Sequence, residues 1–155
     1  MSGASVVEIN QGTASVREAL VNFTGLFNEL TRENIDDIRK VYSQDVTFQD
    51  PFSAVDGIEP LAAYFSNAYA NVIASQFEFG EPVISGRNVC IPWVMKLKHK
   101  RIRGGKEVHV DGISQLCIQG GKVTSHRDYF DAGQLLYENL PVLGKAIQWI
   151  RSHAG

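Results

Sequence analysis

The chain has 155 residues, of which 44% are hydrophobic and 21% charged, and its formal net charge is -2. These values are typical of a single soluble globular domain that is long enough to bury a core. The charge gives no general reason to expect binding to nucleic acid or to an anionic membrane. No apolar run resembles a secretory signal or approaches membrane-spanning length.

The two cysteines, Cys90 and Cys117, lie within apolar, strand-like runs. This placement predicts two buried free thiols in a reducing compartment, so we expect a cytoplasmic protein without a disulfide framework. His99 and His109 have no partners at the spacing of metal ligands. We therefore expect neither a metal nor a cofactor.

Residues 1–12 are polar and rich in small side chains, which predicts a loosely ordered arm before a single domain over residues 13–155. Ser15 and Glu18 then have the spacing of a capping box, which is typical of a helix start. Apolar residues recur after it at helical intervals, and they predict a long amphipathic helix. These residues are Val16, Leu20, Phe23, Phe27 and Leu30.

Two further helices and one strand are expected in the first half. A short helix is predicted over residues 35–42, and a third helix begins at Gly57. Between them, residues 45–49 predict a strand that Pro51 ends, and Asp50 closes its apolar face after Val46 and Phe48. Because Asp before Pro also commonly starts a turn, a structural role for Asp50 stays open. The inward stripe of the third helix is Leu61, Phe65, Ala68 and Val72.

The second half predicts a β-sheet. Four runs alternate or are apolar, and the pairs Ser85-Gly86, Gly104-Gly105 and Gly120-Gly121 between them predict hairpin turns. After the last run, leucine and isoleucine recur over residues 134–151 around Pro141. This pattern predicts a broken C-terminal helix that covers an opening or contacts a partner subunit. The four runs are residues 77–84, 89–99, 107–119 and 123–131.

Basic residues cluster at the predicted hairpin between the two longest strands. No aromatic residues interleave with them, so a solvated hairpin end is favoured over a nucleic-acid patch. The cluster consists of Lys96, Lys98, His99, Lys100, Arg101, Arg103 and Lys106.

Three helices followed by a curved, mainly antiparallel sheet predict an α+β domain in which the sheet wraps around the long helix and encloses a pocket. Strict alternation in the last strand puts His126, Asp128 and Phe130 on one face, where polar groups are costly unless they find partners or a ligand. A satisfied core network and a ligand site both remain open. The predicted polar groups are Asp50, His126 and Asp128, and the predicted lining is Phe27, Phe48, Phe65, Trp93, Met95, Ser114 and Phe130.

The outer face of the same sheet is more apolar than a solvated face requires. Ile113 and Cys117 lie on it among polar residues, with Cys90 and Val94 on the adjacent strand. We therefore expect a homodimer formed through this face.

The segments VYSQDVTFQDPF and GKVTSHRDYFD, in this order of elements, resemble the nuclear transport factor 2-like superfamily. The resemblance extends over residues 16–150 and implies a cone-shaped α+β barrel. The superfamily includes steroid isomerases, limonene epoxide hydrolase, SnoaL-like polyketide cyclases and binding modules without catalysis. The resemblance therefore implies the fold more strongly than an activity.

The isomerases use as base the Asp of an Asp-Pro pair that closes the first strand, which corresponds to Asp50. Their oxyanion hole consists of a Tyr and a protonated Asp, and these positions fall near Leu26 and Ser114. Since both donors differ here, the isomerase set is incomplete.

The epoxide hydrolase has a catalytic Asp in the segment that matches HRDYFD, which corresponds to Asp128. Its Arg and second Asp lie two residues apart on an earlier strand, at the positions of Trp93 and Met95. The epoxide hydrolase set is therefore also incomplete.

Two functions are compatible with these features. The first is an enzyme that binds a small, largely apolar molecule and transfers protons without a cofactor, in an isomerisation, cyclisation or hydration, with Asp50, Asp128 and His126 as catalytic residues. The second is a non-catalytic, dimeric ligand-binding or scaffolding module. The incomplete catalytic sets favour the module, and the convergence of polar groups on an apolar wall favours the enzyme.

Overall fold

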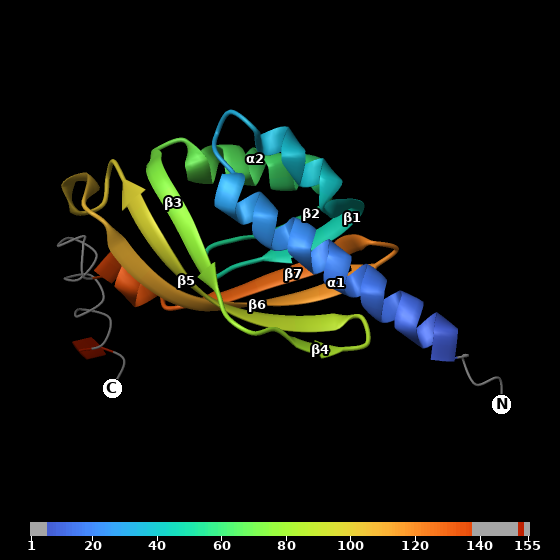
Figure 1. The fold of residues 1–155 in the computed structure, drawn as a ribbon. Coiled ribbons are helices and arrows are strands. Elements are labelled where there is room, and N and C mark those ends of the chain that lie inside the picture. The colour runs from blue at the N-terminus through green and yellow to red at the C-terminus, as the bar shows by residue number, and fades with distance from the viewer. Residues whose placement is uncertain (1–5, 138–151, 154–155) are drawn as a thin grey trace.

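A curved sheet of seven strands forms the body of the protein (Figure 1). The computed structural model describes residues 6–137 and 152–153. The strands are β1 (Tyr42–Gln49), β2 (Ala54–Asp56), β3 (Val72–Phe79), β4 (Val83–Ser85), β5 (Asn88–His99), β6 (Val108–Gln119) and β7 (Lys122–Phe130). Their order is β2-β1-β7-β6-β5-β3, and β4 pairs with β5. All pairs are antiparallel except β1 with β7. The predicted α+β class and mainly antiparallel sheet are confirmed.

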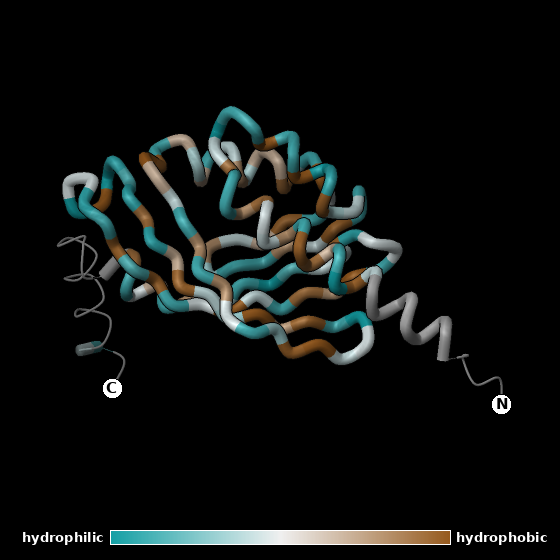
Figure 2. Tube along the Cα trace, in the orientation of Figure 1, coloured by the Kyte–Doolittle hydropathy of each residue, from teal (hydrophilic) through white to brown (hydrophobic). Residues whose placement is uncertain are grey.

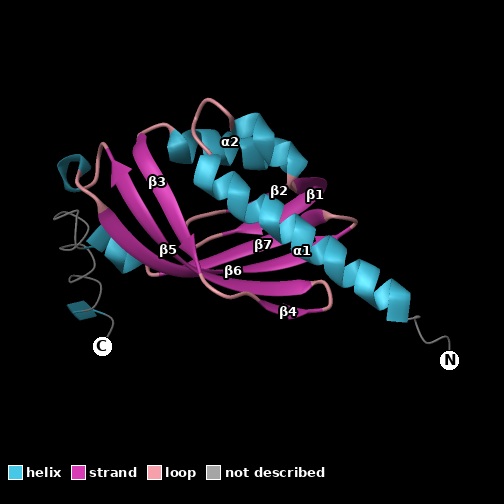
Figure 3. Ribbon diagram, viewed as in Figure 1, coloured by secondary structure: helices cyan, strands magenta, loops and turns pink. Residues whose placement is uncertain are grey.

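Helix α1 (Val6–Glu29) crosses the sheet, and α2 (Ile58–Tyr69) lies beside it against the same face (Figure 3). The predicted apolar stripe of α1 is confirmed, since all five of its residues are buried. The helix begins at Val6, within the segment for which the sequence predicted a loosely ordered arm. A single glycine, Gly12, costs only about 1 kcal/mol relative to alanine inside a helix and does not end it.

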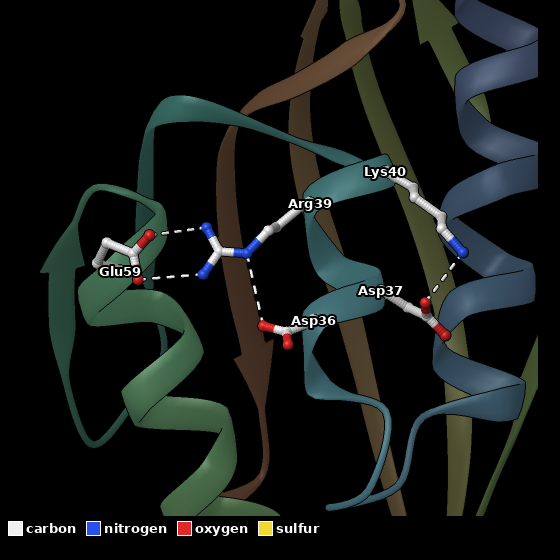
Figure 4. Close-up of polar contacts among 5 residues, drawn as sticks. All are labelled: Asp36, Asp37, Arg39, Lys40 and Glu59. Atoms are coloured by element: carbon white, nitrogen blue, oxygen red, sulfur yellow. Dashed lines mark hydrogen bonds and ion pairs between the residues drawn. The ribbon is translucent and has the colours of Figure 1, made fainter.

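A short 3-10 helix, η1 (Ile35–Lys40), replaces the second helix that the sequence predicted and buries Ile35 and Ile38. Figure 4 shows how it is joined to α2: the Arg39 guanidinium contacts both carboxylate oxygens of Glu59, at 2.8 and 3.1 Å. Because these side chains are exposed, water and salt screen the ion pair and it contributes little to stability. The core holds η1 in place through its two isoleucines.

Alternation along the central strands is visible as changing hydropathy in Figure 2. The face of β5 predicted to be apolar consists of Ile91, Trp93, Met95 and Leu97, and all of these are buried except Met95, which is partly buried. On β6 every second residue from Ser114 to Ile118 is buried. This alternation places one apolar face toward α1 and α2.

The predicted strict alternation of β7 is wrong at its beginning. Val123 and His126 are both buried, although the sequence pattern assigned them to opposite faces. The register explains this difference: Cys117 pairs with Ser125 and Ile118 with Val123, so Thr124 is an extra residue on β7. A bulge of this kind shifts the residues before it to the other face of the sheet.

Two element boundaries also differ from the predictions. The third helix ends at Tyr69, and Val72 begins β3 opposite His99 instead of ending the helical stripe. Strand β2 was not predicted, because its three residues are too few for alternation to be visible. The predicted glycine turn between β6 and β7 is confirmed, with positive φ values of 57° at Gly120 and 77° at Gly121.

The outer face of the sheet carries the residues of the predicted dimer contact. Ile113 is 37% exposed, and Cys90, Cys117 and Val94 are partly exposed. The two cysteines are free but not buried, because they lie on outward-facing positions of β5 and β6. The homodimer stays a prediction.

The chain after β7 forms a short π-helix, Gly133–Tyr137. The greater part of the predicted broken C-terminal helix, residues 138–151, lies outside the described residues. Within the described part of the chain, no helix has the length and apolar character to cross a membrane.

Candidate functional site

A cavity of about 460 Å³ lies between the inner face of the sheet and α2. Its wall is mainly apolar and rich in aromatic residues. Phe52, which is 50% exposed, contacts Phe130 at a ring separation of 5.7 Å. Six of the seven predicted lining residues are part of the wall: Phe27, Phe48, Phe65, Trp93, Met95 and Phe130. Asp50 and Asp128 also line it, whereas Ser114 and His126 do not.

Trp93 takes its position because its cross-strand neighbour is Gly112. A Cβ atom at Gly112 would lie only 2.3 Å from Cη2 of the indole, so the ring lies directly over the glycine. This close contact brings the indole N–H to Ser114, and the Nε1–Oγ distance is 2.9 Å. A glycine on β6 therefore determines the orientation of the largest wall residue.

A chain of hydrogen bonds continues from Trp93 through the wall into the core. The Ser114 hydroxyl donates to Oδ1 of Asp128 at 2.5 Å, and His126 Nε2 contacts the same oxygen at 2.6 Å. The other ring nitrogen of His126, Nδ1, contacts the Tyr42 hydroxyl at 2.7 Å. The chain thus combines residues from β5, β6, β7 and β1.

His126 is enclosed by aromatic rings. Its ring is edge-on to Phe23 at 5.2 Å and to Phe48 at 5.0 Å, and it stacks on Tyr42 at 5.9 Å. Only 2% of the residue is exposed, and it borders a void of about 20 Å³ behind the main cavity. The expectation that His126 reaches the same cavity as the two aspartates is therefore wrong, because the rings of α1 and β1 separate it from that space.

The tautomer of His126 follows from its partners. Burial raises the pKa of the Tyr42 hydroxyl well above its ordinary value, so this phenol keeps its proton. We assign the Tyr42 O–H as donor to Nδ1, which leaves the ring proton on Nε2, facing Asp128. Asp128 Oδ1 then accepts two hydrogen bonds, from Ser114 and from His126.

Asp128 is where this network meets the cavity. Its side chain is 19% exposed, and among the described residues Oδ2 accepts no hydrogen bond. Since both donors hold Oδ1, the second oxygen is left with its lone pairs for a bound molecule. The network thus fixes the orientation of a carboxylate and keeps one of its oxygens available.

Asp50 is held differently. Its Oδ1 accepts the backbone N–H groups of Phe52 and Ser53 at 2.8 and 2.9 Å, which is the geometry of an Asx turn. Its Oδ2 accepts the hydroxyl of Tyr64. The structural role that the Asp-Pro pair left open is therefore realised, and both oxygens of Asp50 have partners.

Three tyrosines at the site were not predicted from the sequence. Tyr42 donates to His126, Tyr64 donates to Asp50, and Tyr69 lines the cavity. Burial raises the pKa of Tyr64, with a further contribution from Asp50, and burial raises that of Tyr69. The signal for Tyr42 was its even spacing from Val46 and Phe48, the buried residues of β1, although Gln44 between them is exposed.

Ser114 also differs from its predicted role in the pocket. Its hydroxyl donates to Asp128 and is not directed to a ligand. In the described part of the chain, no three His, Cys, Asp or Glu side chains lie close enough together to hold a metal ion.

Helices packed on a curved, mostly antiparallel sheet, around an aromatic cavity with a carboxylate in its wall, define a protein of the nuclear transport factor 2-like α+β fold. The model of the SnoaL-like domain matches residues 23–126, and the chain belongs to this family. Comparison with curated proteins finds no match.

Solved structures share this fold. A hypothetical protein with a ketosteroid isomerase-like fold from Catenulispora acidiphila, in complex with trimethylamine, is 17% identical with a TM-score of 0.68, over 77% of this chain and 89% of that one. A putative SnoaL-like polyketide cyclase from Jannaschia is 17% identical with a TM-score of 0.65, over 88% and 96%. An epoxide hydrolase from M. tuberculosis, similar to limonene epoxide hydrolase, is 19% identical with a TM-score of 0.64, over 84% and 96%. At these identities the likeness shows the fold alone.

Proposed function

We propose that this protein is an enzyme that binds a small, largely apolar molecule in the cavity and transfers a proton on it, with Asp128 as the acid–base group. The observation that carries the proposal is the carboxylate of Asp128, which lines the cavity and whose Oδ1 is fixed by Ser114 and His126, while Oδ2 accepts no hydrogen bond from the described residues. A base in this arrangement is oriented before the substrate binds, so little reorganisation is needed during the reaction.

The proposed chemistry is a proton shuttle. Oδ2 of Asp128 removes a proton from a carbon of the substrate, and the resulting carboxylic acid returns the proton to another atom of the same molecule. An isomerisation or cyclisation of this kind has no net change in protons. The apolar wall excludes water that would otherwise compete for the proton.

His126 acts as a positioning residue in this proposal. It lies outside the cavity and cannot contact the substrate, but its Nε2–H holds Asp128, and Tyr42 fixes the ring. Asp50 supports the turn that carries Phe52, and Tyr64 links this turn to α2. We therefore assign the proton transfer to Asp128 and not to Asp50.

A general substrate for base catalysis tests the proposal without knowledge of the natural substrate. In the Kemp elimination of a nitrobenzisoxazole, a base removes the proton on the ring carbon, the N–O bond breaks, and a coloured cyanophenolate forms. The wild-type protein should catalyse this reaction above the rate of buffer. Asp128→Asn should reduce the rate by about 10²-fold or more, in the range expected for loss of a general base.

Asp45→Asn is the matched control, because Asp45 is an exposed carboxylate on the same sheet and does not line the cavity. It should leave the rate unchanged. Equal Kemp rates for the wild type and for Asp128→Asn, with circular dichroism showing that both proteins are folded, would overturn the assignment of Asp128.

The second candidate, a non-catalytic binding module, is favoured by one observation. Asp50, the residue at the position of the isomerase base, has both oxygens occupied by the protein itself. This candidate predicts that the cavity binds apolar molecules, as measured by titration calorimetry with a naphthol, but that the Kemp rate equals that of buffer.

A further inference from the structure

The basic hairpin between β5 and β6 forms one end of the cavity. His99, Arg101 and Ile102 line it from this hairpin, at the end of the sheet where β3 and β5 curl beside the end of α2 (Figure 1). The backbone fixes this position, since Lys100 N–H donates to the Asn71 carbonyl at 2.9 Å. At least two members of the basic cluster are thus part of the cavity wall and not only of a solvated loop.

Arg101 brings a positive charge to the cavity wall. Two basic residues nearby are paired: Lys96 contacts Glu78 at 2.6 Å, and His109 contacts Glu107 at 2.9 Å. In the described ranges 6–137 and 152–153, no carboxylate forms an ion pair with Arg101. A guanidinium keeps its charge throughout the neutral range and presents a fork of donors that matches a carboxylate.

His99 adds a neutral donor beside it. Its Nδ1 accepts the backbone N–H of Arg101 at 3.1 Å, so the ring proton is on Nε2. Burial, followed by the charge of Arg101, lowers the pKa of His99, which keeps the ring neutral near pH 7. The hairpin thus offers one charged donor group and one neutral donor.

The acidic groups of the cavity lie elsewhere in its wall. Asp128 pairs through Ser114 with Ile91, and the strand from Ile91 to His99 has a contour of roughly 26 Å. Trp93, Met95 and Leu97 fill the wall along this strand. Asp50 and Asp128 would repel an anionic group at their end, whereas Arg101 would attract it.

From this charge asymmetry we infer that the ligand is an amphipathic organic acid, whose carboxylate binds Arg101 and His99 and whose apolar body extends along Trp93 toward Asp128. The inference rests on the proposed function and specifies its substrate class. It also orients the substrate: the carbon that loses its proton to Asp128 is remote from the carboxylate.

A matched pair of ligands tests this inference. Naphthylacetate and naphthylacetamide share one apolar body and differ in the anionic group, and titration calorimetry gives a Kd for each. Wild type should bind the acid roughly tenfold more tightly than the amide, as expected for charge-assisted hydrogen bonds. Arg101→Gln should abolish this preference, because the acid loses its charged partner. The substitution retains the backbone N–H that His99 accepts.

Arg103→Gln is the control, because Arg103 lies on the same hairpin but does not line the cavity. It should retain most of the preference for the acid. Equal Kd values for acid and amide in wild type, or the same preference in Arg101→Gln as in wild type, would overturn the inference.

The proposed function fails in a different way. The Kemp substrate is uncharged, so its turnover does not depend on a preference for acids, and Arg103→Gln, which lies outside the cavity wall, should retain the rate that Asp128→Asn loses. A normal Kemp rate without an acid preference would reject the amphipathic acid and leave the proton transfer in place. An acid preference with no Kemp activity would support the ligand class and reject the catalytic role.

Discussion

Substitution of Gly112 by alanine tests how the cavity wall is built. The new Cβ would lie 2.3 Å from Cη2 and 2.4 Å from Cζ2 of Trp93, whereas carbon atoms in contact prefer about 3.5–4.0 Å. The indole must therefore move by more than ~1 Å. Since the backbone at Gly112 is not in the left-handed region, alanine itself is allowed there, and the ring is the part that must yield.

The magnitude follows from three contributions to the free energy of unfolding. Overpacking in a filled region costs about 1–3 kcal/mol, and loss of the hydrogen bond from Trp93 to Ser114 costs about 1 kcal/mol. Replacing glycine by alanine lowers the conformational entropy of the unfolded chain, which stabilises the folded protein by about 0.4–1 kcal/mol. Because the ring can tilt into the cavity, the overpacking cost stays near its lower limit, and we expect a net loss of about 1–1.5 kcal/mol.

Urea unfolding followed by circular dichroism measures this loss, and a second background isolates its cause. In Trp93→Leu no indole lies over position 112, so Gly112→Ala should cost less than about 0.5 kcal/mol there. The tilted ring should also occupy part of the cavity and weaken the binding of naphthylacetamide. An equal loss of stability in both backgrounds would refute the contact as its cause.

Three further predictions concern side chains around the site. Tyr42→Phe should lower the free energy of unfolding by about 1–3 kcal/mol, because the buried Nδ1 of His126 loses its hydrogen-bond donor. Burial raises the pKa of Tyr42 in the folded state, so the unfolded chain releases this proton first and the wild type should lose stability above about pH 10. Urea unfolding measured at several pH values should show a smaller loss for the variant. Asp50→Ala should lower the free energy of unfolding, measured by heat or urea, by about 1–2 kcal/mol. Asp50→Asn should lower it less, because the amide oxygen can still accept hydrogen bonds from the N–H groups of the turn. Equal losses in the two variants would show that the charge of Asp50 matters and not its role as acceptor. Glu59→Ala should leave the midpoint of urea unfolding within the scatter of repeats at physiological salt, since its ion pair with Arg39 is exposed, and a clear loss would contradict this.

Much of the cavity wall was predictable because periodicity is a property of the local backbone. The helical spacing from Val16 to Leu30 located α1 and its buried face, and alternation on β5 directed Trp93 inward. The same parity argument located Asp128 correctly, since it lies after the bulge on β7. A strand of alternating residues has only two faces, so one buried residue determines the direction of its neighbours as long as no residue is inserted.

The sequence by itself thus determined the fold class, the aromatic lining and the presence of carboxylates near it. Only the tertiary structure decided which of these groups has a free oxygen, because hydrogen-bond partners are chosen across strands and not along them. Both oxygens of Asp50 accept hydrogen bonds, from its own turn and from Tyr64, and His126 is enclosed by rings from α1 and β1. Among the described residues, only one oxygen of Asp128 has hydrogen-bond partners. The position of Arg101 in the cavity wall depends equally on long-range geometry, since the curvature of the sheet brings a basic hairpin to a cavity whose acidic groups come from other strands.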